Sequence, residues 1–413
     1  MRAGDTETRL QRVLVVVGIA TLAFNLRPAA VSVGPVLDEV RAGLHLSAAE
    51  TGLLTSLPVL SFATVGALAP RLGRVIGMHR ATVVALVALT GGLWFRTRMD
   101  SGPPFLLLSF LALSGMAVAN VLLPSLVKLH FPDRVGLLTS LYSTFLALGL
   151  TSASVLTVPI AQRGTADDGT GLDWRLGLVA WALTAAVAVL PWVTLVRHDR
   201  RATDAPRHLG LGEVARTRIG WLMAVFFGLQ SLQAYVVFGW FAQLYRDAGF
   251  SASMAGLLLG VATGVSIPLS FLVPSLTARA RDPRVLLTVI MACYPVGYLG
   301  LLVAPVGGAW VWALAVGAGT STFPYILILI GLRARTPAGT AALSGFTQSV
   351  GYLLAALGPF LVGTIYDATG SWTAPLWLLL ALVLPLMAVG AYVGRPAYLE
   401  DQLRDRRTAT TSL

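Results

Sequence analysis

The chain has 413 residues, of which 56% are hydrophobic and only 12% are charged, and its mean hydropathy is +0.76. This composition excludes an ordinary water-soluble domain. The formal net charge of +11 would suit a nucleic-acid-binding protein, but the basic residues are distributed along the chain as membrane topology requires. We therefore expect a membrane protein that has no nucleic-acid partner.

Apolar stretches of about 20 residues recur along the chain, and this is the length that crosses a bilayer as a helix. Backbone groups in lipid must satisfy their hydrogen bonds within their own segment, so each stretch is predicted to be α-helical. The predicted fold class is an all-α polytopic membrane protein with twelve transmembrane helices. Their centres are expected near residues 24, 60, 88, 115, 148, 185, 232, 263, 295, 320, 352 and 382.

The distribution of Lys and Arg predicts the orientation. With an even number of spans both ends of the chain lie on one side, and most of the 30 Lys and Arg fall in segments on that side. The positive-inside rule makes this side cytoplasmic. The external segments are expected to hold Arg41, Arg96, Arg98, Arg163, Arg175 and Arg246. We expect a multi-pass protein of the bacterial cytoplasmic (inner) membrane, in contact with lipid, with both termini cytoplasmic.

Arg27 lies near the middle of the first apolar run. A charge at that depth costs roughly 2.5–3.5 kcal/mol on insertion scales, so it is normally retained for a function. Pro28 follows it and predicts a kinked or locally unwound backbone. A fixed positive charge beside a helix break indicates a site for an anionic or strongly polar solute. The alternative is a structural role, in which Arg27 binds carbonyls freed by Pro28 or extends toward the headgroups.

The two halves of the sequence superpose when the chain is slid along itself. Ser47 then falls on Ser251 and Gly52 on Gly256, while Arg27 falls on the neutral Ser231. Six spans per half is the plan of a secondary transporter built from two parallel repeats. The expected domains are an N-terminal six-helix bundle over 1–196, a cytoplasmic basic linker over 197–218, a C-terminal six-helix bundle over 219–394 and a cytoplasmic tail over 395–413.

Catalytic and metal-binding patterns are absent from the sequence. Cys293 is the only cysteine, and the five histidines fall in expected loops or at helix ends. No Ser-His-Asp or Cys-His set can be assembled at one membrane depth. We expect neither an enzyme nor a cofactor or metal.

The segment from Gly66 to Arg74 resembles the cytoplasmic signature of the major facilitator superfamily, with Pro70 in place of its acidic residue. Longer stretches resemble the cyanate/2-nitroimidazole (CynX/NimT-type) branch. They include Asn25-Leu26-Arg27-Pro28, the segment 124–134, Gln230 to Tyr235 and, most specifically, Ser344 to Tyr352. The resemblance implies a monomeric transporter. Residues assigned to gating or to conformational change are Arg71, Arg74, Arg80, Asp133 and Arg134. For Arg71, Arg74 and Arg80 the alternative role is to anchor the membrane topology.

In this superfamily the first, fourth, seventh and tenth spans line the central cavity, and the second, fifth, eighth and eleventh lie beside them. The resemblance therefore implies the candidate solute contacts Asn25, Arg27, Asn120, Tyr142, Gln230, Gln233, Tyr235, Tyr325, Gln348 and Tyr352. One cation with amide and phenol donors would suit a small planar anion or polar solute. For Asn120 the alternative role is a hydrogen bond between helices, and for Tyr142 and Tyr352 it is packing between helices.

No acidic residue is central in a span, so Arg27 has no expected partner within the membrane. Our hypothesis is a secondary active or facilitative transporter, working by alternating access, whose small anionic or electron-rich solute supplies that partner. Proton coupling would then use acids at the rim, such as Asp38, Glu39 or Asp133. The alternatives are a multidrug or nitroaromatic exporter of the same fold and, in a different class, a non-transporting membrane receptor or scaffold.

Overall fold

The computed structural model describes residues 9–164, 172–196, 210–279 and 283–404. Within these ranges the chain forms helices and no strand, and twelve helical segments are long and apolar enough to cross a membrane. The predicted number of spans is therefore confirmed. Most of the expected linker 197–218, and the end of the tail, lie outside the described residues.

The first half contains six spans, several of which are interrupted. Its elements are α1 (Arg9–Asn25), α2 (Pro28–Val31), η1 (Gly34–Val36), α3 (Leu37–Gly43), α4 (Ala48–Thr64), η2 (Gly66–Leu68), α5 (Ala69–Ile76), α6 (Met78–Arg96), α7 (Gly102–His130), η3 (Pro132–Arg134), α8 (Val135–Ala161) and α9 (Trp174–Leu195).

The second half repeats this plan after a short helix. Its elements are α10 (Leu211–Val214), α11 (Arg218–Asp247), α12 (Ala252–Gly264), α13 (Ser266–Arg279), α14 (Pro283–Val303), α15 (Ala309–Thr320), α16 (Thr322–Leu332), α17 (Pro337–Thr369) and α18 (Thr373–Val393).

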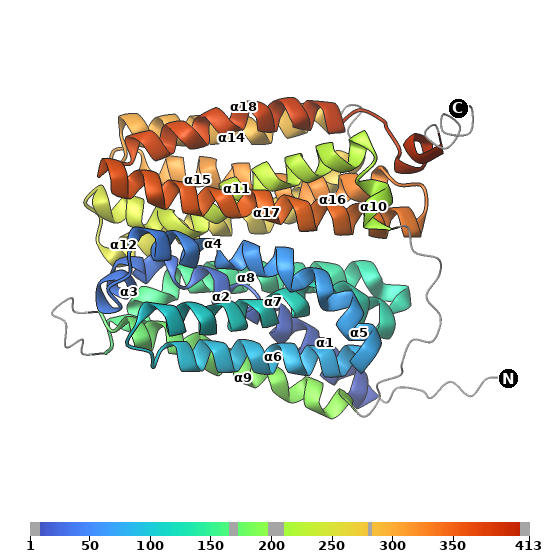
Figure 1. Cartoon of the computed structure of the whole chain (residues 1–413), viewed down its shortest axis with the longest axis horizontal. Helices are drawn as coiled ribbons and strands as arrows, with labels where there is room; N and C mark the ends of the chain where they lie inside the picture. The colour runs from blue at the N-terminus through green and yellow to red at the C-terminus, as the bar shows by residue number, and fades with distance from the viewer. Residues whose placement is uncertain (1–8, 165–171, 197–209, 280–282, 405–413) are drawn as a thin grey trace.

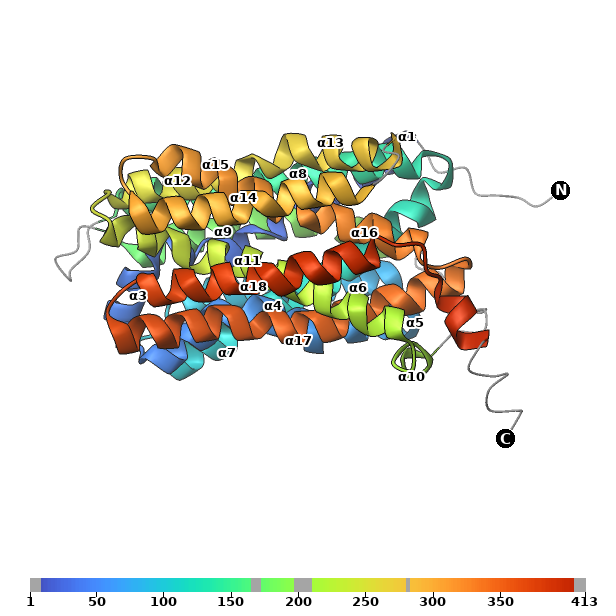
Figure 2. The ribbon, with the colours of Figure 1, turned by 90° about the horizontal axis from the view of Figure 1, so that it is seen from above.

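Elements of the two halves form two bundles that lie against each other (Figure 1). Two helix pairs make most of the contact between them, α4 with α17 and α8 with α12. Figure 2 shows α8 beside α12 and α13, and α4 beside α11 and α17. A site between the bundles is thus bordered by α4 and α17 on one side and by α8 and α12 on the other.

Two serines in register begin equivalent helices of the two bundles. Ser47 caps α4 by accepting a hydrogen bond from the amide of Glu50, and Ser251 caps α12 in the same way through Met254. Such side chains satisfy amides that the first turn of a helix leaves without partners. The sequence agreement between Ser47 and Ser251 therefore has a shared structural cause.

Glycines on α12 allow α8 to approach closely. A Cβ atom on Gly256 would lie 2.8 Å from the Ser154 carbonyl oxygen, and one on Gly260 would lie 2.3 Å from Val155 Cγ2. These distances leave no room for a side chain. These glycines, at four-residue spacing on α12, thus form a contact between the two bundles.

Replacing Gly260 by valine is expected to lower the melting temperature of the purified protein. Overpacking a tight contact costs about 1–3 kcal/mol, because side chains and backbone must shift. Gly264→Ala on the same helix is the control, since a Cβ there would lie 3.6 Å from Thr151, which is ordinary van der Waals contact. Equal melting temperatures for the two variants would contradict the packing account.

The two ends of the molecule differ. At one end α3 and the turn to α4 meet the last turns of α11 and α17, and we call this the sealed end because ion pairs join the bundles there. The other end carries α5 and α10 (Figure 1). The chain enters α1 and leaves α18 at this second end.

Candidate functional site

The first span is interrupted at Arg27, as its sequence predicts. The helix α1 ends at Asn25, and Arg27 is the residue before α2, with φ −101° and ψ −38°. The carbonyl of Arg27 accepts hydrogen bonds from the amides of Ala30 and Val31, both at 3.1 Å. Because Pro28 has no amide hydrogen to continue the α1 ladder, the chain restarts its helix at this point. The break places a charged side chain halfway along the span.

The Arg27 side chain is only partly exposed, and its charge acts on two phenols of the other bundle, Tyr235 on α11 and Tyr352 on α17. Tyr235 lies within reach of the guanidinium, yet its hydroxyl has no hydrogen bond of good geometry within the described residues. The cation of one bundle and the phenols of the other thus face each other, with hydrogen-bonding capacity left over.

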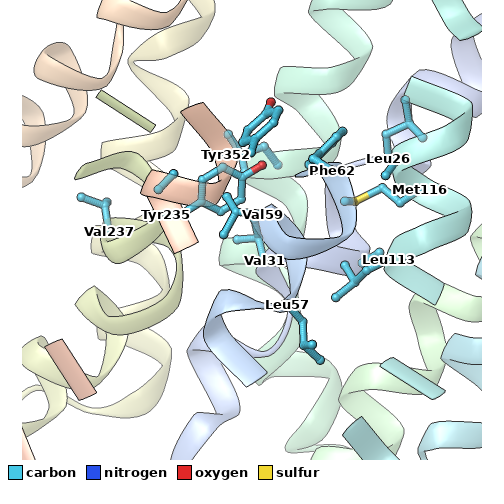
Figure 3. Packing of buried hydrophobic residues seen from close by; sticks show 14 of the residues in the cluster. Leu26, Val31, Leu57, Val59, Phe62, Leu113, Met116, Tyr235, Val237 and Tyr352 are labelled. Carbon is cyan, nitrogen blue, oxygen red and sulfur yellow. The ribbon is translucent and has the colours of Figure 1, made fainter. Parts of the chain in front are cut away.

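Four aromatic rings surround this point. Tyr352 stacks on Phe62 of α4 with ring centroids 4.8 Å apart and 18° between planes, and it meets Phe227 edge-on at 4.9 Å. Tyr235 lies 6.4 Å from Tyr352. Figure 3 shows Tyr235 and Tyr352 side by side and facing Phe62 of the other bundle. Stacked and edge-on rings of this kind make a surface on which a planar solute can bind.

The amide groups separate into two kinds. Gln230 is buried, and its Nε2 donates to Ser231 Oγ at 2.6 Å while its Oε1 has no partner among the described residues. Gln233 is different, because its Nε2 donates to the Leu379 carbonyl at 2.9 Å and its Oε1 accepts from Tyr298 at 2.5 Å. Gln233 therefore joins α11 to α18 and α14. Of these two glutamines, Gln230 is the one that keeps an amide oxygen without a partner among the described residues.

The remaining predicted contacts lie apart from this arrangement or are already engaged. Gln348 donates to Ser344 on its own helix at 2.8 Å, and Tyr325 is fully buried on α16. Asn120 and Tyr142 are partly exposed on α7 and α8, and Tyr142 packs against the core. No described contact brings these four residues to Arg27.

Asn25 is used between helices. Its Nδ2 donates to the carbonyls of Thr21 and Thr184 at 2.9 and 3.1 Å, and its Oδ1 accepts from the Thr184 hydroxyl at 2.7 Å. These bonds join α1 to α9 and use the whole amide. We therefore leave Asn25 out of the proposed solute contacts.

The residues predicted to act in gating lie at the end that carries α5. Their side chains are exposed, and they are Arg71, Arg74, Arg80, Asp133 and Arg134. Their role in gating stays a prediction.

Sequence reasoning missed a charged clamp at the sealed end. Arg246 at the end of α11 binds Glu39 of α3 through two hydrogen bonds, of 2.9 and 2.7 Å, and Glu39 is only 2% exposed. Arg41 of α3 binds Asp367 of α17 at 2.8 Å. Opposite charges at external helix ends of the two repeats were the available signal. These pairs hold the bundles together at this end.

The fold, the interrupted spans and the polar site between two bundles define a class, the transporters built from two six-helix repeats. Comparison with known proteins supports the same class. The chain belongs to the Major Facilitator Superfamily, whose profile matches residues 13–359. The crystal structure of a D-xylose-proton symporter shares the fold, with a TM-score of 0.75 at 13% identity over 94% of this chain and 97% of that one.

Three curated relatives are similar over most of their length. The uncharacterized transporter YycB of Bacillus subtilis is 36% identical over 97% of this chain and 98% of its own. The 2-nitroimidazole transporter of Escherichia coli is 34% identical over 93% and 96%, and the cyanate transport protein CynX of the same organism is 27% identical over 87% and 90%. The chain is accordingly a multi-pass membrane protein of this kind that transports a small solute.

Replacing Asn25 by alanine tests the separation between structural and solute-binding residues. We expect a lower melting temperature, since the lost hydrogen bonds leave Thr184 partly unsatisfied, at a cost of about 1–3 kcal/mol. The affinity for the transported solute should stay within a factor of two. A tenfold weaker affinity in a binding assay on the purified variant would return Asn25 to the solute site.

Proposed function

We propose that this transporter moves a small, planar, anionic or electron-rich solute by alternating access, with Arg27 as its main electrostatic contact. The observation that carries the proposal is the position of Arg27. It lies at a helix break between the bundles, it faces Tyr235 and Tyr352 across their interface, and Tyr235 keeps an unused hydroxyl. An arginine presents a rigid fork of donors that matches two oxygens of an anion or of a nitro group.

The orientation follows from the charges. Arg71, Arg74, Arg80 and Arg134 are exposed at the end that carries α5, so the positive-inside rule makes this end cytoplasmic. The sealed end then faces outward, and the chain lies in the bacterial inner membrane with both termini inside. The arrangement described here would be an inward-facing state, with the outer side closed by the Arg246–Glu39 and Arg41–Asp367 pairs.

A nitroaromatic solute is a second candidate, and the rings around Arg27 favour it. Tyr352 and Phe62 already stack on each other across the bundle interface. A planar heterocycle could replace one of these ring contacts while its nitro group binds Arg27. The relative named for 2-nitroimidazole is also more similar to this chain than the relative named for cyanate, at 34% against 27% identity.

A thermal-shift screen of the purified protein tests the proposed solute class. A ligand that binds only the folded state raises the melting temperature, and the rise grows with the ratio of ligand concentration to dissociation constant. We expect stabilisation by cyanate, benzoate or 2-nitroimidazole at constant ionic strength, and none by organic cations such as tetraphenylphosphonium. Stabilisation by cations alone would overturn the proposal and favour a drug exporter.

A further inference from the structure

Arg96 is the last residue of α6, and its side chain is 0% exposed. It was expected in an external segment, and the structure places it in the last turn of a helix with a buried side chain. Arg98, two residues further on, behaves as expected, because its side chain is exposed, donates to the Trp94 carbonyl at 2.8 Å and lies 4.0 Å from the Trp94 ring. Two neighbouring arginines therefore have opposite environments.

The buried guanidinium of Arg96 has no acceptor. Its Nε, Nη1 and Nη2 atoms make no hydrogen bond within the described residues. The guanidinium makes a cation–π contact with the Phe105 ring, with 5.8 Å between Cζ and the ring centroid. The buried Arg333 shows the usual solution, since it donates to the carbonyls of Val393 and Gly394 at 3.0 and 2.8 Å. Burying five N–H groups and a charge without acceptors is strongly unfavourable. Packing alone gives no reason for an arginine here.

The side chain borders a small cavity between the bundles. Ala30 and Gly34 of the first span, Thr55 of α4, and Tyr235 and Phe238 of α11 line it together with Arg96, which is the only charged residue in its wall. The cavity has a volume of about 10 Å³. This is room for about one water molecule, which could accept from only part of the guanidinium.

Tyr235 connects this cavity to the site at Arg27. Its ring lines the cavity, its unused hydroxyl lies within reach of Arg27, and the cavity wall begins at Ala29, two residues after Arg27. Because α6 runs from the end that carries α5 toward the sealed end, Arg96 lies on the sealed side of Arg27 (Figure 1). An anion that leaves Arg27 toward that side passes Tyr235 and meets Arg96.

We infer that Arg96 is a second anion-binding site for the transported solute, between Arg27 and the sealed end, which is occupied when that end opens. The inference rests on the proposed function. Close backbone contact keeps the cavity small at present, since a Cβ on Gly34 would lie 2.4 Å from the Phe238 carbonyl oxygen. Separating the bundles there would widen the cavity. The site would take the two oxygens of a carboxylate or nitro group, or a linear anion such as cyanate, on the guanidinium fork.

The substitution Arg96→Met tests the inference through two properties of the purified protein. Methionine fills similar space without a charge, so removing an unsatisfied buried charge should raise the melting temperature without ligand by a few degrees. A structural role for Arg96 predicts a fall instead. Arg98→Met is the matched control and should leave the melting temperature unchanged. A loss of folding in Arg96→Met would show a structural role and overturn the inference.

The second property is anion affinity, measured by thermal shift with cyanate, nitrate, benzoate and 2-nitroimidazole in the variant Glu39→Gln, which weakens the sealed end. Adding Arg96→Met should weaken binding at least tenfold, while adding Arg98→Met should change it less than twofold. Binding that requires Arg27 but is indifferent to Arg96 overturns only this inference. If none of the four probes binds the protein with its arginines intact, the proposed function and this inference fail together.

Discussion

Replacing Arg27 by alanine is expected to weaken solute binding by about 10- to 150-fold, the largest effect of any single substitution at the proposed site. A hydrogen bond to a charged group contributes about 1.5–3 kcal/mol, and each 1.4 kcal/mol is a factor of ten in affinity. The lost interaction is not replaced by another cation at this point, because the two side chains on which Arg27 acts, Tyr235 and Tyr352, are neutral. Counterflow in proteoliposomes with cyanate and 2-nitroimidazole measures the effect.

Two further variants serve as controls for the Arg27→Ala measurement. Arg27→Lys keeps the charge but loses the planar fork, so we expect an intermediate affinity. Arg98→Ala removes an exposed arginine outside the site and should behave as the unchanged protein. If Arg27→Ala and Arg27→Lys both keep the normal affinity and rate, the solute does not pair with Arg27. The structural alternative, in which Arg27 only stabilises the helix break, would then remain.

Replacing Glu39 by glutamine is expected to open the sealed end. Removing one partner of a fully buried ion pair costs about 3–5 kcal/mol. We expect about 2–3 kcal/mol here, because the Arg246 side chain is 22% exposed and Asp38 also lies 3.7 Å from it. This free energy is lost only from the state in which the sealed end is closed. The equilibrium between the closed and open states should therefore shift by about 30- to 150-fold toward the open state.

A cysteine at the buried position Val33 reports this opening. In a chain with Cys293 replaced by serine, a membrane-impermeant maleimide should label Val33→Cys faster when Glu39→Gln is present. The exposed Arg335–Asp401 pair, also at 2.8 Å but within one bundle, supplies the control variant Asp401→Asn. The exchange Glu39→Arg with Arg246→Glu should slow the labelling again. Labelling that is independent of Glu39 would show that the clamp does not hold this end closed.

The break in the first span illustrates what local sequence can predict. Pro28 lacks an amide hydrogen wherever the chain goes, so the interruption beside Arg27 follows from two adjacent residues. The serine caps of α4 and α12 are equally local. The number of spans follows from runs of apolar residues, because lipid-exposed backbone has to be helical.

The site itself was predicted only in part, because side chains of the same type have different hydrogen-bond partners in the fold. Gln230 and Gln233 lie three apart on one helix, so the sequence treats them alike. In the fold Gln233 is saturated by Leu379 and Tyr298, whereas Gln230 keeps an unused oxygen. Asn25 lies two residues before Arg27 at the helix break, yet its side-chain amide is hydrogen-bonded to Thr184. Which amide remains free depends on neighbours that lie 65 to 159 positions away in the sequence.

Sequence by itself determined the membrane setting, the twelve helices, the family and the unusual charge at Arg27. Each of these depends on hydropathy, on short motifs or on an internal repeat, which act within one segment or through simple periodicity. Only the tertiary structure decided that Arg246 binds Glu39 and that Arg96 is buried beside Tyr235. Arg96 ends a helix next to the exposed Arg98, so its local sequence indicates a surface position. Its burial comes from packing within the fold, where α7 lies against α6 with Phe105 beside the guanidinium, and where Tyr235 of the other bundle lines the same small cavity.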